Sequence, residues 1–364
     1  MAKLQDKHPS ASLDPVDLPP PSQAGCLLVD ENEVRCAVLS FPSGSAGGPD
    51  GLRPQHIRDM LLCREAGSDF LTALTAFVNL VLAGGCPADV AAVFFGGRLL
   101  ALKKKSGGIR PIAVGFTLRR LVSKCANASG ITELKAFFHP SQPGGCEAAI
   151  HSARRYLESM PHNHVVVKLD FSNAFNSLHR SDMLLAIQTR IPALYAYCHS
   201  AYSQPSVLYH GPYTLLSQEG PQQGDPLGPL LFCNTIQPLL SSLCSDLKLG
   251  YLDDVTLGGP AHDVALDVAE IARVGTGMGL SLNTSKCELI AHPDFSVKDD
   301  LLRSFTRVDI SDTTLLGAPL FTGSVLDKAW SDRCEDLARA VERLNLVSAQ
   351  DALILLSVVK FRVM

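Results

Sequence analysis

Residues 165–175 read VVVKLDFSNAF, and this stretch decides the fold because it joins an apolar strand to a carboxylate. Val165, Val166 and Val167 are β-branched, and a short continuous apolar run is typical of a strand that is covered on both faces. The run ends at Asp170, which places a carboxylate at the mouth of the strand. The sequence therefore predicts a buried strand over 165–169 with an acidic residue at its end.

A second group of carboxylates lies in the stretch GYLDDVTLG at 250–258. Two short apolar arms flank Asp253 and Asp254, which predicts a tight hairpin over 249–257 with both carboxylates at the turn. Such a pair is most often only solvated, but adjacent carboxylates repel each other unless a cation neutralises them, and hard divalent cations take oxygen ligands. If this turn and the end of the 165–169 strand meet at one sheet edge, three carboxylates come together. That set suits a two-metal site for in-line displacement at phosphorus.

Helical periodicity dominates much of the remaining chain. Apolar residues recur every three or four positions in several segments, and each run predicts an amphipathic helix. The predicted helices cover about 55–63, 70–83, 181–191, 225–243, 263–274 and 325–359. The stretch 70–88 carries no charge, but Gly84, Gly85 and Pro87 interrupt it, so a buried helix is expected in place of a membrane span. With a further strand near Leu280, the element order predicts an α+β fold whose antiparallel sheet is backed by helices.

A local basic patch lies within a chain whose overall charge is slightly negative. The formal net charge is −4, so any polyanionic partner must meet particular residues. Between Val90 and Thr132 there is no acidic residue. The same segment holds eight basic residues: Arg98, Lys103, Lys104, Lys105, Arg110, Arg119, Arg120 and Lys124. Apolar arms flank a Gly107–Gly108 turn, which predicts a β-hairpin over 98–114 with a cationic tip, and a solvated loop is the alternative.

Composition excludes several classes of protein. With 364 residues, of which 46% are hydrophobic and 19% charged, the chain is too apolar for a disordered protein and long enough for two or three packed subdomains. Its eleven cysteines are odd in number and widely spaced, which argues against a zinc knuckle or a secreted disulfide framework. The sequence predicts no secretion signal and no transmembrane segment, so nucleus or cytoplasm is the expected compartment. Residues 1–25 are rich in proline and are expected to form a disordered leader.

Seven motifs resemble, in the same order, those of the reverse transcriptase domain of non-LTR retrotransposons. They are GGPDGLRPQHI (47–57), KKKSGGIRPIAVGFTLRRLVSK (103–124), LDFSNAFNSLHR (169–180), GPQQGDPLGPLLF (220–232), YLDD (251–254), GLSLNTSKCELI (279–290) and LLGAPL (315–320). The family is an RNA-directed DNA polymerase with the shape of a right hand. The resemblance implies fingers over 26–160, a palm over 161–313 with fingers elements inserted around 180–220, and a primer-grip hairpin with a truncated thumb over 314–364.

The resemblance also implies the catalytic residues of a nucleotidyltransferase. Asp170 and Asp253 match the principal metal ligands of the family, Asp254 supports them, and the backbone carbonyl of Phe171 completes the set. Two Mg²⁺ ions, with Mn²⁺ as a substitute, are the implied cofactors. In this chemistry the metals lower the pKa of a primer 3′-hydroxyl and hold the triphosphate, while the protein mostly positions and neutralises.

Residues of the basic hairpin and the first palm motif match nucleotide-binding positions. Arg110 and one of Lys103, Lys104 and Lys105 are expected to bind the triphosphate, because a guanidinium offers phosphate a bidentate fork. Phe175 matches the aromatic gate that fills the space of a ribose 2′-hydroxyl and so favours deoxynucleotides. The alternative for Phe175 is a core aromatic behind the strand.

Five more residues match family positions and each has an ordinary structural alternative. Gln223 and Gly224 correspond to a pair that touches the incoming nucleotide and the template-side base, or they form a plain turn. Lys286 corresponds to a proposed general acid for the pyrophosphate leaving group, or it is a solvated lysine. Leu316 and Gly317 correspond to the primer grip, or to a simple hairpin.

The implied partners are an RNA template, a DNA or RNA primer and deoxynucleoside triphosphates, with a further protein that supplies a nuclease or the missing thumb function. No membrane is implied. Two alternatives stay open. One is a truncated, non-catalytic retroelement remnant or a repurposed nucleic-acid-binding module. The other is a template-dependent RNA polymerase, although such enzymes tend to carry a polar residue in the place of Phe175.

Overall fold

The strand predicted at 165–169 lies in the middle of a five-stranded sheet. The computed structural model describes residues 1–11, 18–22, 25–104, 107–134 and 145–358. In this sheet, called here the central sheet, the strand order is β6-β7-β3-β8-β9. The strands are β3 (His164–Leu169), β6 (Leu247–Tyr251), β7 (Asp254–Pro260), β8 (Glu288–Ala291) and β9 (Thr306–Val308). All neighbours are antiparallel except β8 and β9, so the predicted α+β fold with an antiparallel sheet is confirmed.

Helices cover both faces of the central sheet, which explains the three successive valines of β3. The covering helices are α7 (Gly145–Glu158), α11 (Gly228–Ser242) and α12 (Ala261–Gly277). Val165 and Val167 belong to the core that β3 shares with α11 and α12. Val166 points to the other face, where it packs in the core that includes α7. Successive strand side chains alternate between faces, so a strand that is buried on both faces reads as a continuous apolar run.

A second sheet carries the predicted basic hairpin. Its strand order is β2-β1-β4-β5, and the helices around it form the largest core of the molecule. The strands are β1 (Gly97–Lys103), β2 (Ile109–Gly115), β4 (Ser206–His210) and β5 (Tyr213–Ser217). The surrounding helices are α2 (Glu31–Leu39), α3 (Pro54–Leu61), α4 (Gly67–Leu82), α5 (Ala88–Phe94), α6 (Thr117–Glu133), α9 (Arg180–Arg190) and α10 (Tyr195–Tyr202). Strands β1 and β2 confirm the hairpin predicted over 98–114, and β4 joins it in parallel pairing with β1.

The predicted helices all have counterparts, whereas one predicted strand is wrong. The segments at 55–63, 70–83, 181–191, 225–243 and 263–274 correspond to α3, α4, α9, α11 and α12. In the part of the chain that the structure describes, no helix is both long and apolar enough to cross a membrane. The strand expected near Leu280 lies later, at β8. Its place is taken by a turn in which the Asn283 carbonyl accepts bonds from the amides of Lys286 and Cys287.

The first residues of the chain are ordered against the second sheet, unlike the disordered leader expected over 1–25. Helix α1 (Ala2–Gln5) is only one turn long, but Leu4 is just 3% exposed. It packs with Leu99, Ala113 and Leu208 of the sheet. Residues 12–17 and 23–24 of the expected leader lie outside the described residues.

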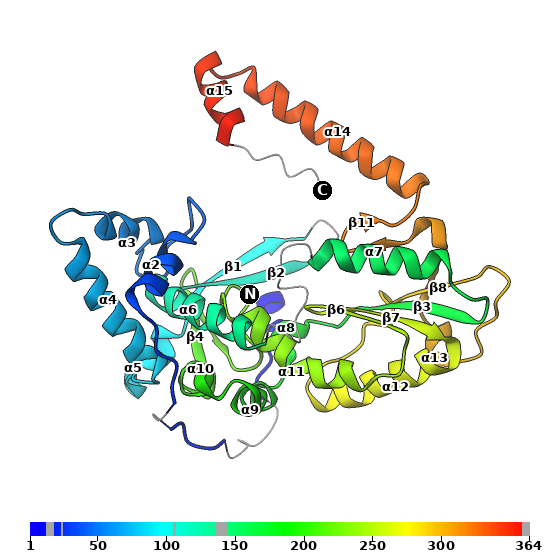
Figure 1. Ribbon diagram of the computed structural model, residues 1–364, viewed down its shortest axis with the longest axis horizontal. Coiled ribbons are helices and arrows are strands. Elements are labelled where there is room, and N and C mark those ends of the chain that lie inside the picture. Colours follow the sequence, from blue (N-terminus) through cyan, green and yellow to red (C-terminus); the bar gives the residue numbers. More distant parts are fainter. Residues whose placement is uncertain (12–17, 23–24, 105–106, 135–144, 359–364) are drawn as a thin grey trace.

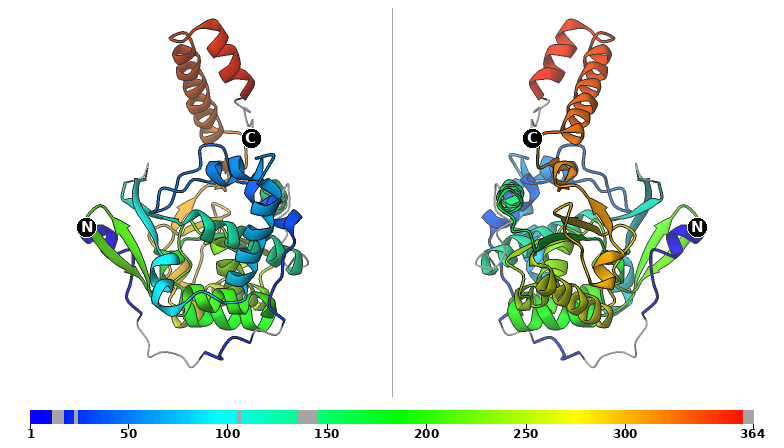
Figure 2. Two further views of the ribbon diagram at one scale, coloured as in Figure 1. Left: turned by 90° about the vertical axis from the view of Figure 1, so that its left-hand side faces the viewer. Right: turned by 90° about the vertical axis from the view of Figure 1, so that its right-hand side faces the viewer.

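The C-terminal helices extend away from the rest of the molecule. Helix α14 (Ser324–Leu344) follows the short hairpin of β10 (Thr314–Leu315) and β11 (Ala318–Pro319), and α15 (Ala349–Val358) turns back beside it, as Figure 1 and the two side views of Figure 2 show. No residue of α14 is buried, and its Trp330 is 58% exposed. The two helices agree with the helical segment predicted over 325–359.

Candidate active site

The three predicted carboxylates lie at one edge of the central sheet. Leu169 pairs with Val255 across β3 and β7, so Asp170 and Asp254 follow next to each other at the strand ends. Asp253 occupies the tight turn between β6 and β7, after Leu252, whose φ of 57° is in the left-handed region. The register of three strands therefore brings together carboxylates that are more than eighty positions apart in the sequence.

Burial and mutual repulsion both act on the carboxylates at this edge. Burial raises the pKa of Asp253, and the charge of Asp170 adds to this, while Arg110 and Lys104 act in the opposite direction. Burial also raises the pKa of Asp254, with further contributions from Asp253 and Asp170. Among the described residues, none of the three carboxylates makes an ion pair within 4.0 Å. A bound cation would offset the repulsion between these carboxylates.

The donor chemistry at the edge fits hard divalent cations. Carboxylate oxygens are the ligands that Mg²⁺ prefers, and uncompensated carboxylates gain most from its charge. The side chains are not arranged as a metal site: within the described ranges, no three His, Cys, Asp or Glu side chains form a group that could hold a metal ion. The fit therefore rests on the donor set and its charge.

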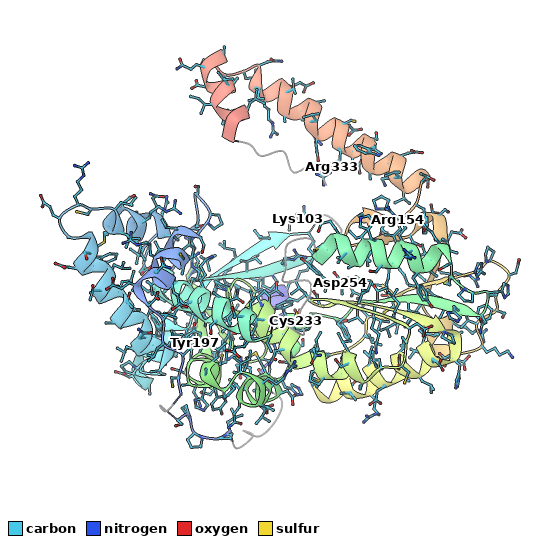
Figure 3. The ribbon with its side chains drawn as sticks, in the orientation of Figure 1. Lys103, Arg154, Tyr197, Cys233, Asp254 and Arg333 are labelled. Atoms are coloured by element: carbon cyan, nitrogen blue, oxygen red, sulfur yellow. The ribbon has the colours of Figure 1, made fainter. Side chains whose placement is uncertain are left out.

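The basic hairpin supplies cations on the side that the carboxylates face. Burial is the main cause that lowers the pKa of Lys104. The nearby positive charges of Arg110, Lys286 and Lys7 lower it further, whereas Asp170 raises it. Lys104 is thus an electrostatic neighbour both of the carboxylates and of three other cations. Lys103 and Arg110 are exposed on the two arms of the hairpin, and Figure 3 marks Lys103 on the hairpin and Asp254 on the central sheet. Lys105 lies outside the described residues.

The two aromatic residues of the first palm motif differ in their surroundings. Phe171 is buried and forms an isolated bridge with Leu282. Phe175 is partly exposed, and its ring stacks on Phe232 of α11 with centroids 4.7 Å apart and planes 11° from parallel. This packing agrees with the core-aromatic alternative for Phe175, and its role as a nucleotide gate stays a prediction.

Gln223 and Gly224 form a turn that presses against strand β2. The Gln223 carbonyl accepts a 2.7 Å hydrogen bond from the Ala113 amide. Gly224 has a φ of 121°, and a Cβ on it would lie 2.3 Å from the Ala113 carbonyl oxygen. Only glycine fits this approach, so the turn links the second sheet to the start of α11.

Lys286, Leu316 and Gly317 flank the carboxylate edge. Lys286 is exposed on the turn before β8, close enough to Lys104 to lower its pKa. Leu316 and Gly317 make the tight turn between β10 and β11, with φ values of 50° and 82°. Leu316 also packs against the core that includes α7 and lines a cavity together with Asp254. The roles of Lys286, Leu316 and Gly317 stay predictions.

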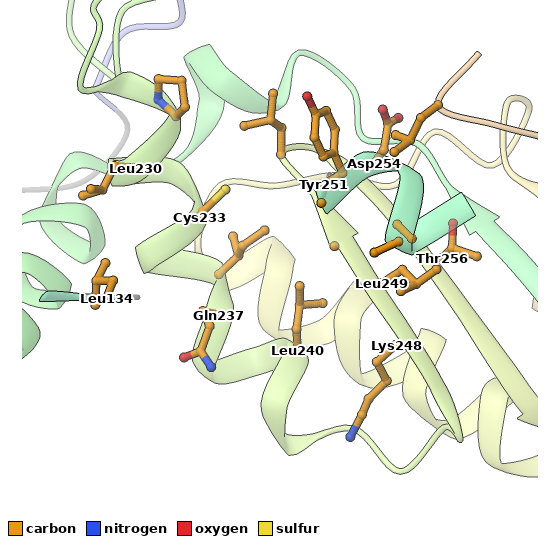
Figure 4. A pocket seen from close by; sticks show the side chains of 18 of the residues that line it. Leu134, Leu230, Cys233, Gln237, Leu240, Lys248, Leu249, Tyr251, Asp254 and Thr256 are labelled. Atoms are coloured by element: carbon orange, nitrogen blue, oxygen red, sulfur yellow. The ribbon is translucent and has the colours of Figure 1, made fainter. Parts of the chain in front are cut away.

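An apolar cavity that sequence reasoning missed opens beside Asp254. It has a volume of about 870 Å³ and lies between α6, α7, α11 and strand β6. Figure 4 shows Leu240, Leu249, Tyr251 and Cys233 on its wall, with Asp254 at its rim. Burial raises the pKa of the Cys233 thiol to about 11, so this thiol is neutral at physiological pH. No local pattern predicts this cavity, because four elements that are remote in the sequence form it.

A buried ion pair was also missed, although both of its residues lie inside recognised motifs. Arg119 of α6 and Asp225 are joined by a 2.9 Å contact, and their side chains are only 2% and 1% exposed. The Asp225 carboxylate also accepts a 2.5 Å hydrogen bond from the Tyr202 hydroxyl. Its position before α11 suggested a helix cap, but the N-cap residue is Leu227, and the Asp225 carboxylate accepts a hydrogen bond from the Leu227 amide.

The N-terminal segment reaches the turn that follows Asp170. The side-chain amides of Asn173 and Asn176 donate to the Lys7 carbonyl at 3.1 and 2.9 Å. Since Leu4 packs on the second sheet, residues 4–7 bridge that sheet and the first palm motif.

Comparisons with known proteins point to one family. A family model described as reverse transcriptase (RNA-dependent DNA polymerase) matches residues 102–317, which is more than half of the chain. The 132 kDa protein of the retrotransposable element SLACS from Trypanosoma brucei gambiense is 25% identical over 287 residues, which is 75% of this chain and 24% of the relative. The chain therefore spans about a quarter of the length of this curated relative.

The solved structures that match the chain include two telomerases. Apo telomerase from Candida tropicalis gives a TM-score of 0.43 at 13% identity over 55% of this chain and 44% of that chain. Telomerase from Candida albicans, solved with a TWJ fragment of telomeric RNA, gives a TM-score of 0.43 at 11% identity over 58% and 44% of the two chains.

Proposed function

Because the chain belongs to the reverse transcriptase (RNA-dependent DNA polymerase) family, we propose that it extends a primer 3′-hydroxyl with deoxynucleotides at the carboxylate edge of the central sheet. The observation that carries this proposal is the placement of Asp170, Asp253 and Asp254 at one sheet edge, opposite the cations of the β1–β2 hairpin. Nucleotidyl transfer needs this arrangement, since phosphate and hydroxyl oxygens must be held close together while negative charge is neutralised.

The carboxylates would hold the metal ions. Asp170 and Asp253 are the proposed principal ligands, with Asp254 and the carbonyl of Phe171 in support. Two Mg²⁺ ions, or Mn²⁺ in their place, would supply activation of the primer hydroxyl and neutralisation of the triphosphate when bound. The carboxylate edge fits them through its oxygen donors and through the mutual repulsion of its carboxylates, which a cation would offset.

The cations and the aromatic ring would bind and select the nucleotide. Lys103, Lys104 and Arg110 grip the triphosphate, and Lys286 delivers a proton to the departing pyrophosphate. Phe175 bars a ribose 2′-hydroxyl with the accessible part of its ring, held in place by the stack on Phe232.

The remaining predicted residues complete the substrate path. Gln223 and Gly224 contact the nascent base pair from a turn fixed against β2, and Leu316 and Gly317 form the primer grip.

The proposed subdomain boundaries follow from these assignments. Residues 26–160 with the β4–β5 insertion form the fingers, residues 161–313 the palm, and residues 314–364 the primer grip and the start of a thumb. We assign the activity to a retrotransposon, in line with the similarity to the SLACS protein. The template is RNA, the primer is DNA or RNA, and a further protein or segment supplies nuclease activity.

The test is incorporation of dTTP on poly(rA) primed with oligo(dT), with Mg²⁺ or Mn²⁺. Wild type is compared with the Asp253→Asn/Asp254→Asn double variant, and circular dichroism shows that both chains are folded. Extension by wild type alone supports the polymerase and its metal site. A folded wild type that extends no primer with either metal would reject the proposal and favour a non-catalytic nucleic-acid-binding module.

A further inference from the structure

A buried polar network lies behind the Gln223–Gly224 turn. Its centre is Arg119, whose guanidinium contacts the Asp225 carboxylate at 2.9 Å and also donates to the Gln222 side chain and the Phe95 carbonyl. The Tyr202 hydroxyl donates to Asp225 at 2.5 Å. All these side chains are buried, so water does not compete for their hydrogen bonds.

The electrostatics show that the network is neutralised internally. Burial by itself lowers the pKa of Arg119, but Asp225 and the neighbouring tyrosines more than offset this, and the pKa is raised. Burial and Asp225 together raise the pKa of Tyr202 well above its usual range, so its hydroxyl stays protonated and remains a donor. The network thus has one charge pair with fixed donors around it.

Two members of the network bracket the turn on either side. Gln222 precedes it, and its side-chain amide donates to Ser206 at 2.7 Å and to the Phe95 carbonyl at 3.0 Å. Asp225 follows the turn and holds the first amides of the approach to α11. Because both flanking residues are bound to Arg119, the two residues between them have little freedom to shift relative to β2.

We propose that Arg119 is a positioning residue for nucleotide binding: through Gln222 and Asp225 it fixes the Gln223–Gly224 turn against Ala113 of β2. This rests on the proposed function, in which that turn contacts the incoming nucleotide. The network acts on the affinity for the nucleotide and leaves the chemical step at the carboxylates unchanged.

The experiment weakens the network by one hydroxyl and compares it with a matched hydroxyl elsewhere. Tyr202→Phe removes the donor to Asp225 and keeps the ring. Ser245→Ala removes a hydroxyl that donates to the buried Asp267, also at 2.5 Å. Ser245 lies before β6, at the end of the β6–β7 ladder opposite the carboxylates, so its loss affects stability without touching the turn.

The kinetic readout separates positioning from stability. With dTTP on poly(rA) and oligo(dT), we expect Tyr202→Phe to raise KM for dTTP roughly tenfold with kcat changed less than about twofold, because the network that fixes the turn loses a hydrogen bond to a charged group. Ser245→Ala should lower the melting temperature similarly and leave KM unchanged. Equal KM values in the two variants would overturn the proposal.

A second readout does not depend on polymerisation. Hydrogen exchange of the amides in peptides that contain Ala113 and residues 220–227 should become faster in Tyr202→Phe but not in Ser245→Ala. If wild type fails to extend the primer while this exchange difference is present, the proposed function fails and the positioning role stands. Unchanged exchange in the peptides of Tyr202→Phe contradicts the positioning role, whatever the activity.

Discussion

The carboxylate edge and the Arg119–Asp225 pair differ in the exposure and pairing of their charged groups. At the edge, Asp170, Asp253 and Asp254 are partly or fully accessible, and their nearest cations act from a distance. In the pair, both charges are almost fully buried and joined at 2.9 Å. A site that performs chemistry must leave charge available for its substrates, whereas a buried charge in a scaffold must be fully paired. The buried pair flanks the Gln223–Gly224 turn, whereas the carboxylates lie at the ends of β3 and β7.

The largest expected effect is the loss of an unpaired carboxylate. Asp170→Asn should reduce dTTP incorporation by roughly 10⁴-fold, because metal stabilisation is worth several kcal/mol and each 1.36 kcal/mol is tenfold in rate. The measurement is steady-state incorporation on poly(rA) with oligo(dT). Retention of more than about a tenth of the activity would mean that Asp170 holds no metal. Unfolding is checked by thermal melting, which should change little.

The buried pair should give the opposite pattern, with a large loss of stability. Arg119→Met leaves Asp225 charged, buried and without its partner, which should cost about 3–5 kcal/mol of unfolding free energy. The control is Arg273→Met, which breaks the exposed 2.7 Å pair with Glu270 and should change the unfolding free energy very little, because solvent screens this pair. Urea denaturation measures both. Similar costs for the two variants would remove the distinction between the regions.

A substitution of Phe175 tests whether the site at the carboxylate edge also selects deoxynucleotides. Phe175→Val should improve the use of UTP relative to dTTP by about tenfold or more, because the smaller side chain leaves room for a 2′-hydroxyl. Loss of the stack on Phe232 should also lower stability by about 1 kcal/mol. Competition between the two nucleotides gives the ratio. If wild type already incorporates UTP as readily as dTTP, Phe175 is a core residue only.

The smallest effect concerns charge repulsion at the edge itself. In EDTA, Asp253→Asn should melt roughly 2 °C above wild type, since it removes one of three neighbouring like charges. Added Mg²⁺ should raise the melting temperature of wild type more than that of the variant, because binding to the folded state stabilises it. An equal response of both chains to Mg²⁺ would argue against Asp253 as a ligand.

The carboxylate edge could be predicted from the sequence because the patterns that indicate it are local. The valines before Asp170 and the short arms around Asp253 and Asp254 each define a strand end, and the motif order fixes which ends meet. The strand predicted near Leu280 was wrong because this buried apolar residue ends the helical segment before it: its amide donates to the Gly275 carbonyl, and strand β8 begins only at Glu288. The roles of the site residues themselves stay predictions.

The buried pair could not be predicted by the same reasoning. Arg119 and Asp225 are 106 positions apart, and each sits among residues that already suggest another explanation, a basic patch for Arg119 and a helix cap for Asp225. The docking of Leu4 was missed for a related reason, because the composition of residues 1–25 describes the average of the segment and not one apolar side chain that fits a preformed core.

The position of helix α1 has a practical consequence for work with this protein. Met1 is 44% exposed, but the next few residues lie against the second sheet and the Asn173–Asn176 turn, close to the proposed nucleotide site. A purification tag placed before Met1 would extend from the protein surface next to that site. A small fluorophore in the same place would instead report on nucleotides as they enter, and a C-terminal tag beyond α14 and α15 would start from helices that extend away from the sheets.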